Sequence, residues 1–523
     1  MSLLKKTVLQ VFPATSARGR AVKRTAVKLK LAKPFHYDPA YQQWMEVVEP
    51  YTFNDPLKNF VNPIDKDKPL FSIVIPAWNT EQKYLLPLID SIVSQSFGDW
   101  ELILADGSTI DERQEAIEDI SHKDPRIKYH KLSKNGGISD NTNQGLEFAK
   151  GSFVVFMDHD DTLAPAALNE LAIYIANDLK VEIIYTDEDK LTDDGLWRHS
   201  PHFKPDWAPH QFMNCNYTNH LSAIRSDLVK KAGGLDTAHN GAQDYEFLLR
   251  VHGLPGERVV GHIPKVLYHW RQATGSTAAV FDVKAYAIEA GRSALEKYLK
   301  NRKLNVSVAA VPNRPGFYEP RIVVAIDRKA LVIIDGEDSL YTNSFRNRLQ
   351  EMTTTDEFKS VDFVTNNEFE KNKEGLLKTF ADDDCLVRIN DFILPTKIDW
   401  LERLCGILEL KEVKAVAPRI IAFDGHIWDM GIIIDAEGKE QHIFRGLRDF
   451  DDTQFGHSEW IRDVDALTGN FTATRKKQSG EYNVIWSPVV AKYMGSRRQK
   501  SPRFNENLSV MNKGHISVLW KRK

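Results

Sequence analysis

Cysteine is scarce in this chain of 523 residues, which contains only three. Cys215, Cys385 and Cys405 stand far apart, without the paired spacing of a zinc site or the density of a disulfide framework. This scarcity excludes the small disulfide-stapled folds that are common among secreted proteins. We therefore expect a protein of the reducing cytoplasm.

Long apolar runs are missing as well. No stretch approaches the roughly 18 uncharged apolar residues that a membrane-spanning helix needs. The first residues lack the uninterrupted apolar core and the cleavage site of a signal peptide, so none is expected. The formal net charge of −3 argues against general nucleic-acid binding, and no nucleic-acid partner is expected. The chain is 42% hydrophobic and 27% charged, as globular proteins are, and its length predicts two or three domains.

Acidic residues are absent from the start of the chain. Before Asp38 the charged residues are all Lys or Arg, with Leu, Val and Phe between them. Two interpretations stay open. The segment lies on an anionic membrane surface, which contributes about 1 kcal/mol per basic residue near the lipid, or it is a disordered or loosely packed tail. His36 to Pro69 predicts an irregular connector, and we assign residues 1–65 to the basic segment and this connector.

Apolar runs of strand character alternate with segments of helical periodicity from residue 71 onward. The predicted strands cover residues 71–76, 101–106, 127–130, 153–157, 181–185 and 263–271, and the predicted helices cover residues 85–94, 111–121, 139–150, 168–179, 243–250 and 285–299. The alternation predicts an α/β domain with a mostly parallel, Rossmann-like sheet, which we place at residues 66–305. In such sheets, ligands bind at the carboxyl ends of the strands.

Carboxylates cluster at two of these strand ends. Asp158, Asp160 and Asp161 follow an apolar strand, and oxygen ligands so placed favour a hard divalent cation that carries a substrate's phosphates. The alternative is that these acids cap a helix or solvate a turn. The strand at residues 181–185 runs into a second acidic edge, which comprises Asp187, Glu188 and Asp189.

A glycine-containing segment, residues 135–145, lies between Asp106 and Asp158. Its paired glycines allow a close backbone approach, and Ser139 is a candidate cap for the helix that follows. The N–H groups at that helix start would favour an anion. The spacing matches neither the P-loop nor the dinucleotide-binding fingerprint, so both of those phosphate sites are excluded.

Together, residues 70 to about 275 resemble a family-2 glycosyltransferase with the GT-A fold, of the bacterial subgroup that builds O-antigen and other surface polysaccharides. The resemblance rests on motifs in a shared order, at residues 71–76, 101–108, 137–145, 157–161, 185–190, 203–207, 241–250 and 268–271. It implies a nucleoside-diphosphate sugar donor (UDP- or dTDP-linked), Mn²⁺ or Mg²⁺ as metal, and a glycan or lipid-linked oligosaccharide acceptor. Ala105 and Gln243 depart from the family pattern, because each replaces an acid that relatives commonly carry.

The resemblance implies a role for each motif. Asp244 matches the catalytic base of an inverting mechanism, Asp106 the position that binds the nucleotide base, and His269 a histidine that often completes the metal site. Asp158 and Asp160 match the Asp-x-Asp pair of metal ligands, with Asp158 closer to the ribose. Further nucleotide contacts are expected from Pro76, Asn79, Gly137, Asn143 and Arg271. Contacts to the donor sugar or the acceptor are expected from Asp187, Glu188, Asp189, Lys204, Trp207 and Gln243.

Several of these residues also have a structural explanation. Asp244 is explained as an acid in the first turn of a helix, where the helix dipole favours it. His269 is explained as a packed, hydrogen-bonded histidine. Packing rather than sugar stacking is the alternative for Trp207 and Trp270, and Glu188 is explained as a solvated or structural acid.

Residues 306–523 show a fainter echo of the same pattern. Leu331 to Gly336 predicts a strand followed by an acid and a glycine, and Cys385 to Asp391 resembles the strand that carries the first acidic cluster. Ile389 stands where the first metal ligand would be, and no acid pair heads an apolar helix between Arg475 and Glu481. We expect a degenerate GT-A-like module without transferase chemistry, which packs on the first module or helps to bind its acceptor. An unrelated α/β accessory domain is the alternative.

The sequence therefore predicts a cytoplasmic, metal-dependent, inverting glycosyltransferase that extends a surface polysaccharide at the inner face of the membrane. One alternative is a nucleotidyltransferase that makes the activated sugar, but Pro76-Ala77-Trp78-Asn79 is not the glycine-rich, basic phosphate loop of that class. The other alternative is a catalytically silent glycan-binding or scaffold subunit. Binding of a nucleotide sugar without turnover would favour it.

Overall fold

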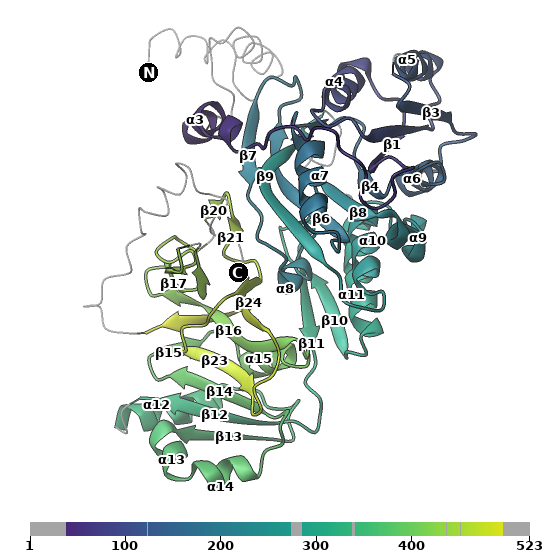
Figure 1. Ribbon diagram of the computed structural model, residues 1–523. Helices are drawn as coiled ribbons and strands as arrows, with labels where there is room; N and C mark the ends of the chain where they lie inside the picture. The colour runs from purple at the N-terminus through teal and green to yellow at the C-terminus, as the bar shows by residue number, and fades with distance from the viewer. Residues whose placement is uncertain are drawn as a thin grey trace, which may run out of the picture.

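The computed structural model describes residues 38–122, 124–273, 285–336, 340–435, 437–449 and 451–494. Two sheet-centred modules follow one another along the chain, the first in purple to teal and the second in green to yellow (Figure 1). The basic segment that we expected to contact a membrane, residues 1–37, lies outside the described residues. Within the described part of the chain, no helix is long and apolar enough to cross a membrane.

The first module is built on a mixed sheet. Its strands are β1 (Phe71–Ala77), β2 (Trp100–Asp106), β3 (Ile127–Lys131), β4 (Phe153–Phe156), β5 (Thr162–Leu163), β6 (Ile183–Leu191), β7 (Arg198–His202), β8 (Ser222–Arg225) and β9 (Val260–Arg271). They lie in the order β3-β2-β1-β4-β8-β6-β9-β5, with β7 paired to β6. Strands β3, β2, β1 and β4 are parallel, and β8 is antiparallel to both β4 and β6. The predicted α/β class is confirmed.

Helices cover both faces of this sheet. They are α4 (Gln82–Val93), α5 (Asp111–Ser121), α6 (Ile138–Leu146), α7 (Ala167–Asn177), α8 (Pro209–Phe212), α9 (Ser226–Ala232), the 3₁₀ turn η2 (Thr237–His239), α10 (Gln243–His252) and α11 (Ala285–Asn301). In β1, Ile73 and Ile75 pack into the core formed with α4, α5 and α7, whereas Val74 packs into the core formed with α9, α10 and α11. Two buried faces explain why the sequence shows β1 as a continuous apolar run.

The helix expected at residues 139–150 starts earlier and ends sooner than predicted. Helix α6 begins after Gly137, whose φ of 90° suits glycine, and ends at Leu146. Ser139 was predicted to cap this helix, but its Oγ instead donates to Asn240 Oδ1 at 2.6 Å. That prediction was wrong because a partner distant in sequence takes the hydroxyl.

The connector predicted to be irregular contains a helix, α3 (Pro39–Val47), followed by the 3₁₀ turn η1 (Glu49–Tyr51). Asp38 caps α3 with its side chain, and proline stands at the first helical position. Tyr41 and Trp44 lie on one face of the helix and are buried against Phe203 of the first module. The connector is therefore part of the first module's packing.

The second module repeats the strand order of the first. After the hairpin β10 (Val306–Ala310) and β11 (Tyr318–Ile322), its main sheet comprises β12 (Lys329–Asp335), β13 (Ser360–Thr365), β14 (Cys385–Asn390), β15 (Ile393–Pro395), β16 (Val413–Ala422), β17 (Ile427–Asp429), β22 (Arg462–Val464), β23 (Phe471–Arg475) and β24 (Tyr482–Tyr493). The order β13-β12-β14-β23-β16-β24-β15 corresponds, with the same strand directions, to β2-β1-β4-β8-β6-β9-β5. The expectation of a second module of the same architecture is confirmed.

Shorter elements complete the second module. They are α12 (Leu340–Glu351), α13 (Asn366–Lys371), α14 (Lys373–Lys378), α15 (Trp400–Ile407), β18 (Ile432–Ile434), β19 (Glu440–His442), β20 (Asp452–Thr453) and β21 (Gly456–His457). The connection between β23 and β24, residues 476–481, contains no helix, whereas the corresponding connection in the first module carries α10. A long insertion between β17 and β23 carries β18 to β22.

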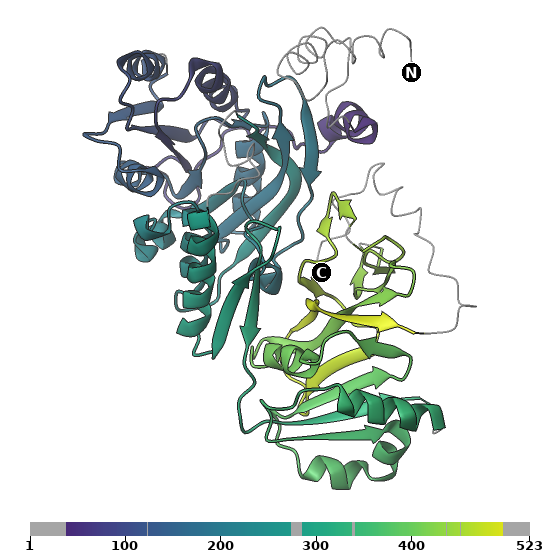
Figure 2. The same cartoon turned by 180° about the vertical axis from the view of Figure 1, so that it is seen from behind.

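The two modules meet through buried polar contacts. Asp463, in β22, accepts hydrogen bonds from the backbone N–H groups of His210 at 3.1 Å and Gln211 at 3.3 Å. These groups lie in the first turn of α8, so Asp463 caps that helix across the interface. Figure 2 shows the teal hairpin β10–β11 between the modules, and a bridge from Cys215 to Phe317 attaches it to the first. The predicted boundary between residues 305 and 306 falls immediately before this hairpin.

Candidate functional site

A cleft of about 1090 Å³ lies at the carboxyl ends of β1, β4 and β6, and both modules form its walls. From the first module, predicted site residues that line it are Pro76, Gly137, Asp158, Glu188, Asp189, Gln243 and Asp244. The second module contributes Thr453, Gly456, His457 and Trp460. The cleft therefore brings the acidic strand ends together with the head of α10.

Asp158 lies just beyond β4, with 41% of its side chain exposed in the cleft. Protein surrounds the carboxylate closely, so desolvation and then the negative charges of Asp160 and Asp244 raise the pKa of Asp158 to about 7. The imidazole of His220 is also near, with its Nε2 at 4.0 Å from Asp158 Oδ2. Carboxylates in this arrangement favour a bound cation.

Asp161 has a different environment, because it is fully buried. Its carboxylate accepts hydrogen bonds from the Tyr268 hydroxyl and, at 2.7 Å, from the backbone N–H of Arg271. Burial, followed by the charges of Asp160 and Asp158, raises the pKa of Asp161. The guanidinium Nε of Arg271 donates to the backbone oxygen of Asp160 at 2.7 Å. Residues 158–161 form the acidic loop that follows β4. Strand β9 holds this loop in place, and Arg271 supports it from outside the cleft lining.

Asp244 occupies the first turn of α10 and lines the cleft. Its Oδ2 accepts hydrogen bonds from Asn219 Nδ2 at 2.5 Å and from Asn216 Nδ2 at 3.2 Å. The two amides orient the carboxylate, and both bind the same oxygen. The neighbouring Gln243 accepts a hydrogen bond from the N–H of Gly241 at 2.7 Å, which stabilises the turn that leads into the helix.

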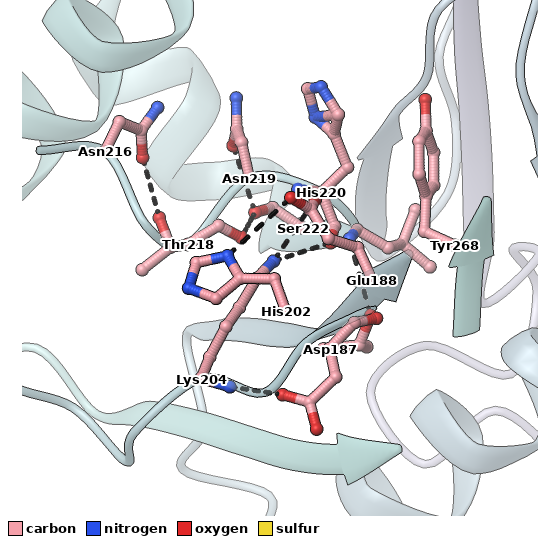
Figure 3. Close-up of polar contacts among 12 residues, drawn as sticks. Asp187, Glu188, His202, Lys204, Asn216, Thr218, Asn219, His220, Ser222 and Tyr268 are labelled. Carbon is pink, nitrogen blue, oxygen red and sulfur yellow. Dashed lines mark hydrogen bonds and ion pairs between the residues drawn. The ribbon is translucent and has the colours of Figure 1, made fainter. Parts of the chain in front are cut away.

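A buried ion pair between Lys204 and Glu188 supports another part of the cleft wall. Lys204 Nζ lies 3.5 Å from Glu188 Oε2 and donates to the His220 backbone oxygen at 2.7 Å (Figure 3). Glu188 also accepts from the His220 N–H. Burial alone would raise the pKa of Glu188, but Lys204, His202 and His220 together lower it to about 2. Lys204 therefore acts on the cleft through Glu188 and His220.

Three predicted nucleotide contacts have structural roles outside the cleft lining. Asp106 is fully buried, and its Oδ1 accepts from the N–H of Ser108 at 2.9 Å. Asn79 Oδ1 accepts from two consecutive backbone N–H groups that precede α5. The side chain of Asn143 donates to the carbonyl and accepts from the N–H of Leu235, both at 2.8 Å. These contacts fix the loops at the edge of the sheet.

Besides Lys204, two further predicted substrate contacts lie away from the cleft lining. Trp207 stacks on His252 with 4.3 Å between the ring centroids, which agrees with the packing alternative. Asp187 is buried, and its Oδ1 lies 2.9 Å from His262 Nε2. The other ring nitrogen of His262 lies 2.9 Å from Asp206, so the two carboxylates overcome the effect of burial and raise the pKa of His262.

His269 points to Asp189, with 2.7 Å between His269 Nδ1 and Asp189 Oδ1. The other oxygen of Asp189 accepts from the Tyr41 hydroxyl and from Arg198 Nε, both at 2.6 Å. Among the described residues, one group of three potential ligands lies within 4.8 Å of one another, and it comprises Asp236, His239 and Glu246. The ligand atoms of the three residues predicted to bind the metal, Asp158, Asp160 and His269, do not all lie within 4.8 Å of one another.

Sequence reasoning missed three residues that face the cleft, Asn216, Asn219 and His220. They lie on the segment between α8 and β8. A run of three asparagines and a histidine between residues 214 and 220, directly before an apolar strand, was the available signal. Such a run offers many hydrogen-bond donors and acceptors at a strand end.

Comparison with known proteins bears on this cleft. Residues 72–229 match the sequence profile of the family described as glycosyl transferase family 2. The chain contains a family-2 glycosyltransferase domain. This domain has the GT-A fold, as predicted, and it carries the acidic loop after β4.

Two relatives of this glycosyltransferase domain are longer than the chain. An uncharacterized protein of Sinorhizobium fredii is 40% identical over 232 residues, which are 44% of this chain and 25% of the relative. The O-antigen biosynthesis protein RfbC of Myxococcus xanthus is 27% identical over 441 residues, 78% of this chain and 34% of that protein. The chain thus spans about a quarter to a third of these curated relatives. A crystal structure of S. aureus TarS 1–349 in complex with UDP-GlcNAc covers 44% of this chain and 72% of that one, at 20% identity and a TM-score of 0.34.

Proposed function

We propose that this protein is an inverting, metal-dependent glycosyltransferase that moves a sugar from a nucleoside diphosphate to a growing, lipid-linked surface polysaccharide. The observation that carries the proposal is one cleft, in a family-2 glycosyltransferase domain, that contains both Asp158 and Asp244. One residue lies at a strand end and the other at a helix start. A donor and an acceptor can therefore meet between them.

Asp244 would act as the general base. Its carboxylate would take the proton of an acceptor hydroxyl while that oxygen forms a bond to the anomeric carbon of the donor sugar. The bond from the anomeric carbon to the diphosphate oxygen breaks in the same step, on the opposite face, so the configuration inverts. The hydrogen bonds from Asn216 and Asn219 support this role, because they fix the carboxylate before the acceptor arrives.

Asp158 and Asp160 would hold the metal. The fit rests on the density of carboxylates, because the charges of Asp160 and Asp244 help to raise the pKa of Asp158 and a bound cation would offset that repulsion. When bound, Mn²⁺ or Mg²⁺ would neutralise the charge that develops on the leaving diphosphate. His269 stays a candidate ligand, since Asp189 binds its Nδ1 in the way that carboxylates orient metal-binding histidines.

The substrates in this proposal are a UDP- or dTDP-linked sugar and a glycan on a lipid carrier at the inner face of the cytoplasmic membrane. The likeness to RfbC supports a role in O-antigen-like polysaccharides, because the 441-residue alignment is longer than the first module and extends into the second. Pro76 and Gly137 line the cleft and are proposed donor contacts, and Glu188, Asp189 and Gln243 are proposed contacts of the donor sugar or acceptor.

The experiment is a turnover assay of the full chain against UDP-, dTDP- and GDP-sugars. Each donor is tested with Mn²⁺, with Mg²⁺ and with a chelator, and release of nucleoside diphosphate is measured. The proposal predicts metal-dependent turnover of a UDP- or dTDP-sugar, with a product anomer opposite to that of the donor by ¹H NMR. Retention of configuration, or equal turnover with the chelator, would contradict the mechanism. Donor binding without turnover in the presence of acceptor would favour the silent scaffold.

A further inference from the structure

The second module contributes part of the wall of the first module's cleft. The residues involved, Thr453, Gly456, His457 and Trp460, lie on the insertion between β17 and β23 and line the same cavity as Asp158 and Asp244. From this juxtaposition we infer that the insertion forms a saccharide-binding subsite for the acceptor, with Trp460 as its stacking platform. The inference rests on the proposed transferase function and assigns a role in it to the second module.

An aromatic pair forms the centre of this wall. The rings of Trp460 and Phe317 have centroids 5.2 Å apart at an interplanar angle of 33°, and both side chains are partly exposed. His202 meets Trp460 edge-on at 5.5 Å. A Cβ added at Gly456 would lie 2.1 Å from the Trp460 ring, and the φ of Gly456 is 89°. Glycine therefore lets the indole lie against the chain, which sets the orientation of the ring.

The aromatic pair lies on the side of the cleft where Asp244 is held. Phe317 bridges to Cys215, and the next residue, Asn216, donates to Asp244. After Phe317 comes Tyr318, whose ring stacks on Tyr245 at 5.8 Å. Tyr245 in turn follows Asp244 in α10. Two short sets of contacts therefore link the aromatic pair to Asp244, one through Asn216 and one through Tyr245. The proposed donor contacts Pro76 and Gly137 lie on other elements, β1 and the start of α6.

This position indicates the acceptor rather than the donor. A general base must reach the hydroxyl that it deprotonates, so the acceptor sugar has to lie beside Asp244. An aromatic face with polar groups around it suits a sugar ring, which has apolar C–H faces and a polar rim. The polar groups here include His457 Nε2, which lies 2.9 Å from a terminal guanidinium nitrogen of Arg314.

The insertion is held firmly enough to serve as a binding wall. Asp463 caps α8, and the N–H of Phe203 donates to the Gln454 carbonyl at 2.9 Å. The N–H of Ile461 donates to Asn214 Oδ1 at 3.4 Å. These contacts flank Trp460 on both sides along the chain. A subsite that is formed before binding costs less ordering entropy when the acceptor arrives.

The test compares Trp460→Ala, Trp460→Phe and a control, Trp428→Ala, in the full chain. Trp428 is also partly exposed and stacked, on Tyr493 at 3.8 Å, but does not line the cleft. With a donor that the wild type hydrolyses, two rates are measured. One is hydrolysis without acceptor, and the other is transfer to p-nitrophenyl glycosides of glucose, galactose, mannose, rhamnose and N-acetylglucosamine, with saturation-transfer-difference NMR of the same glycosides.

We expect Trp460→Ala to raise the acceptor KM at least tenfold while donor hydrolysis and donor KM stay within twofold of wild type. Trp460→Phe keeps an aromatic face and should stay within about threefold, and Trp428→Ala should behave as wild type. An unchanged acceptor KM in Trp460→Ala overturns the inference, as does an equal loss of donor hydrolysis. Hydrolysis by the wild type with no glycoside bound or glycosylated also overturns it, and leaves the transferase proposal standing. If the wild type neither binds nor hydrolyses any donor, it is the proposed function that fails.

Discussion

Asp463 of the second module lies 2.5 Å from the Nδ1 atom of His210 in the first, although 253 residues separate them along the chain. Both side chains are buried. The same carboxylate caps α8, the helix that precedes the asparagine-rich segment which holds Asp244. The second module is therefore coupled to the cleft by packing, although it lacks a counterpart of α10, the helix that carries the proposed base Asp244.

Removing this contact should destabilise the protein. Asp463→Ala leaves the imidazole and two backbone N–H groups without their acceptor in a buried interface, and we expect a loss of about 3 kcal/mol in the free energy of unfolding. Urea titration of wild type and variant, followed by tryptophan fluorescence, measures the difference. Asp356→Ala, at an exposed carboxylate of the second module, serves as control. A loss below about 1 kcal/mol for Asp463→Ala would contradict the role of this contact.

The acidic loop should separate into a structural and a functional carboxylate. Asp161→Ala removes the acceptor of the Tyr268 hydroxyl and of the Arg271 N–H, so the free energy of unfolding should fall by about 2 kcal/mol. Thermal and urea denaturation of the variant test this expectation. A stable Asp161→Ala protein that has lost metal binding would show that the two roles had been assigned to the wrong carboxylates.

Asp160 should be needed for metal but not for folding. Asp160→Asn removes one proposed anionic metal ligand and leaves the backbone oxygen that Arg271 contacts. We expect Mn²⁺-dependent affinity for UDP or dTDP to fall at least tenfold by calorimetry, with the urea midpoint unchanged. Asp227→Asn, at a carboxylate that is 51% exposed in the first turn of α9, is the matched control. Equal metal-dependent affinity in wild type and Asp160→Asn would contradict the metal site.

Glu188 should make stability depend on acid pH. Its pKa is lowered from 4.5 to about 2 in the folded state, so the folded protein gains stability that is complete above pH 4.5 and is lost as pH falls toward 2. The full contribution is about 3 kcal/mol, of which about 1 kcal/mol is lost by pH 3.5. Urea titrations at pH 6 and pH 3.5 should show this loss in wild type and in the exposed-residue control Glu351→Gln, but not in Glu188→Gln. An equal loss of unfolding free energy between pH 6 and pH 3.5 in all three proteins would contradict the ion pair with Lys204.

The buried frame of the first module was predictable from sequence for a physical reason. Strands β1, β2 and β4 are buried on both faces, so they appear as apolar runs, and the polar residues that end them mark the edge where the cleft forms. Asp158 and Asp244 could be placed there because each directly follows or begins a regular element. Helix α3 was missed although Asp38 and Pro39 form a start signal, because the surrounding residues are rich in turn formers.

Contacts between distant residues could not be predicted. Asn216 and Asn219 bind Asp244 although more than twenty residues separate them in sequence, and no sequence pattern indicates this contact. The Ser139 hydroxyl binds Asn240, which lies 101 residues away, instead of capping its helix. Trp207 was predicted to contact the substrate because it belongs to a motif of the family, yet its ring stacks on His252 at the end of α10. The position of Trp460 depends on the packing of a whole module, and its local sequence carries no sign of a cleft.

The central claim is that Asp244 is the base of a transferase, and a comparison of wild type with Asp244→Asn tests it most directly. The amide keeps the shape of the side chain but cannot take a proton at neutral pH. For the donor that the wild type uses, we expect transfer to fall by at least about 10²-fold in Asp244→Asn, with metal-dependent nucleotide binding within twofold by calorimetry and Asp227→Asn fully active. An Asp244→Asn protein that transfers sugar at the wild-type rate would contradict the account.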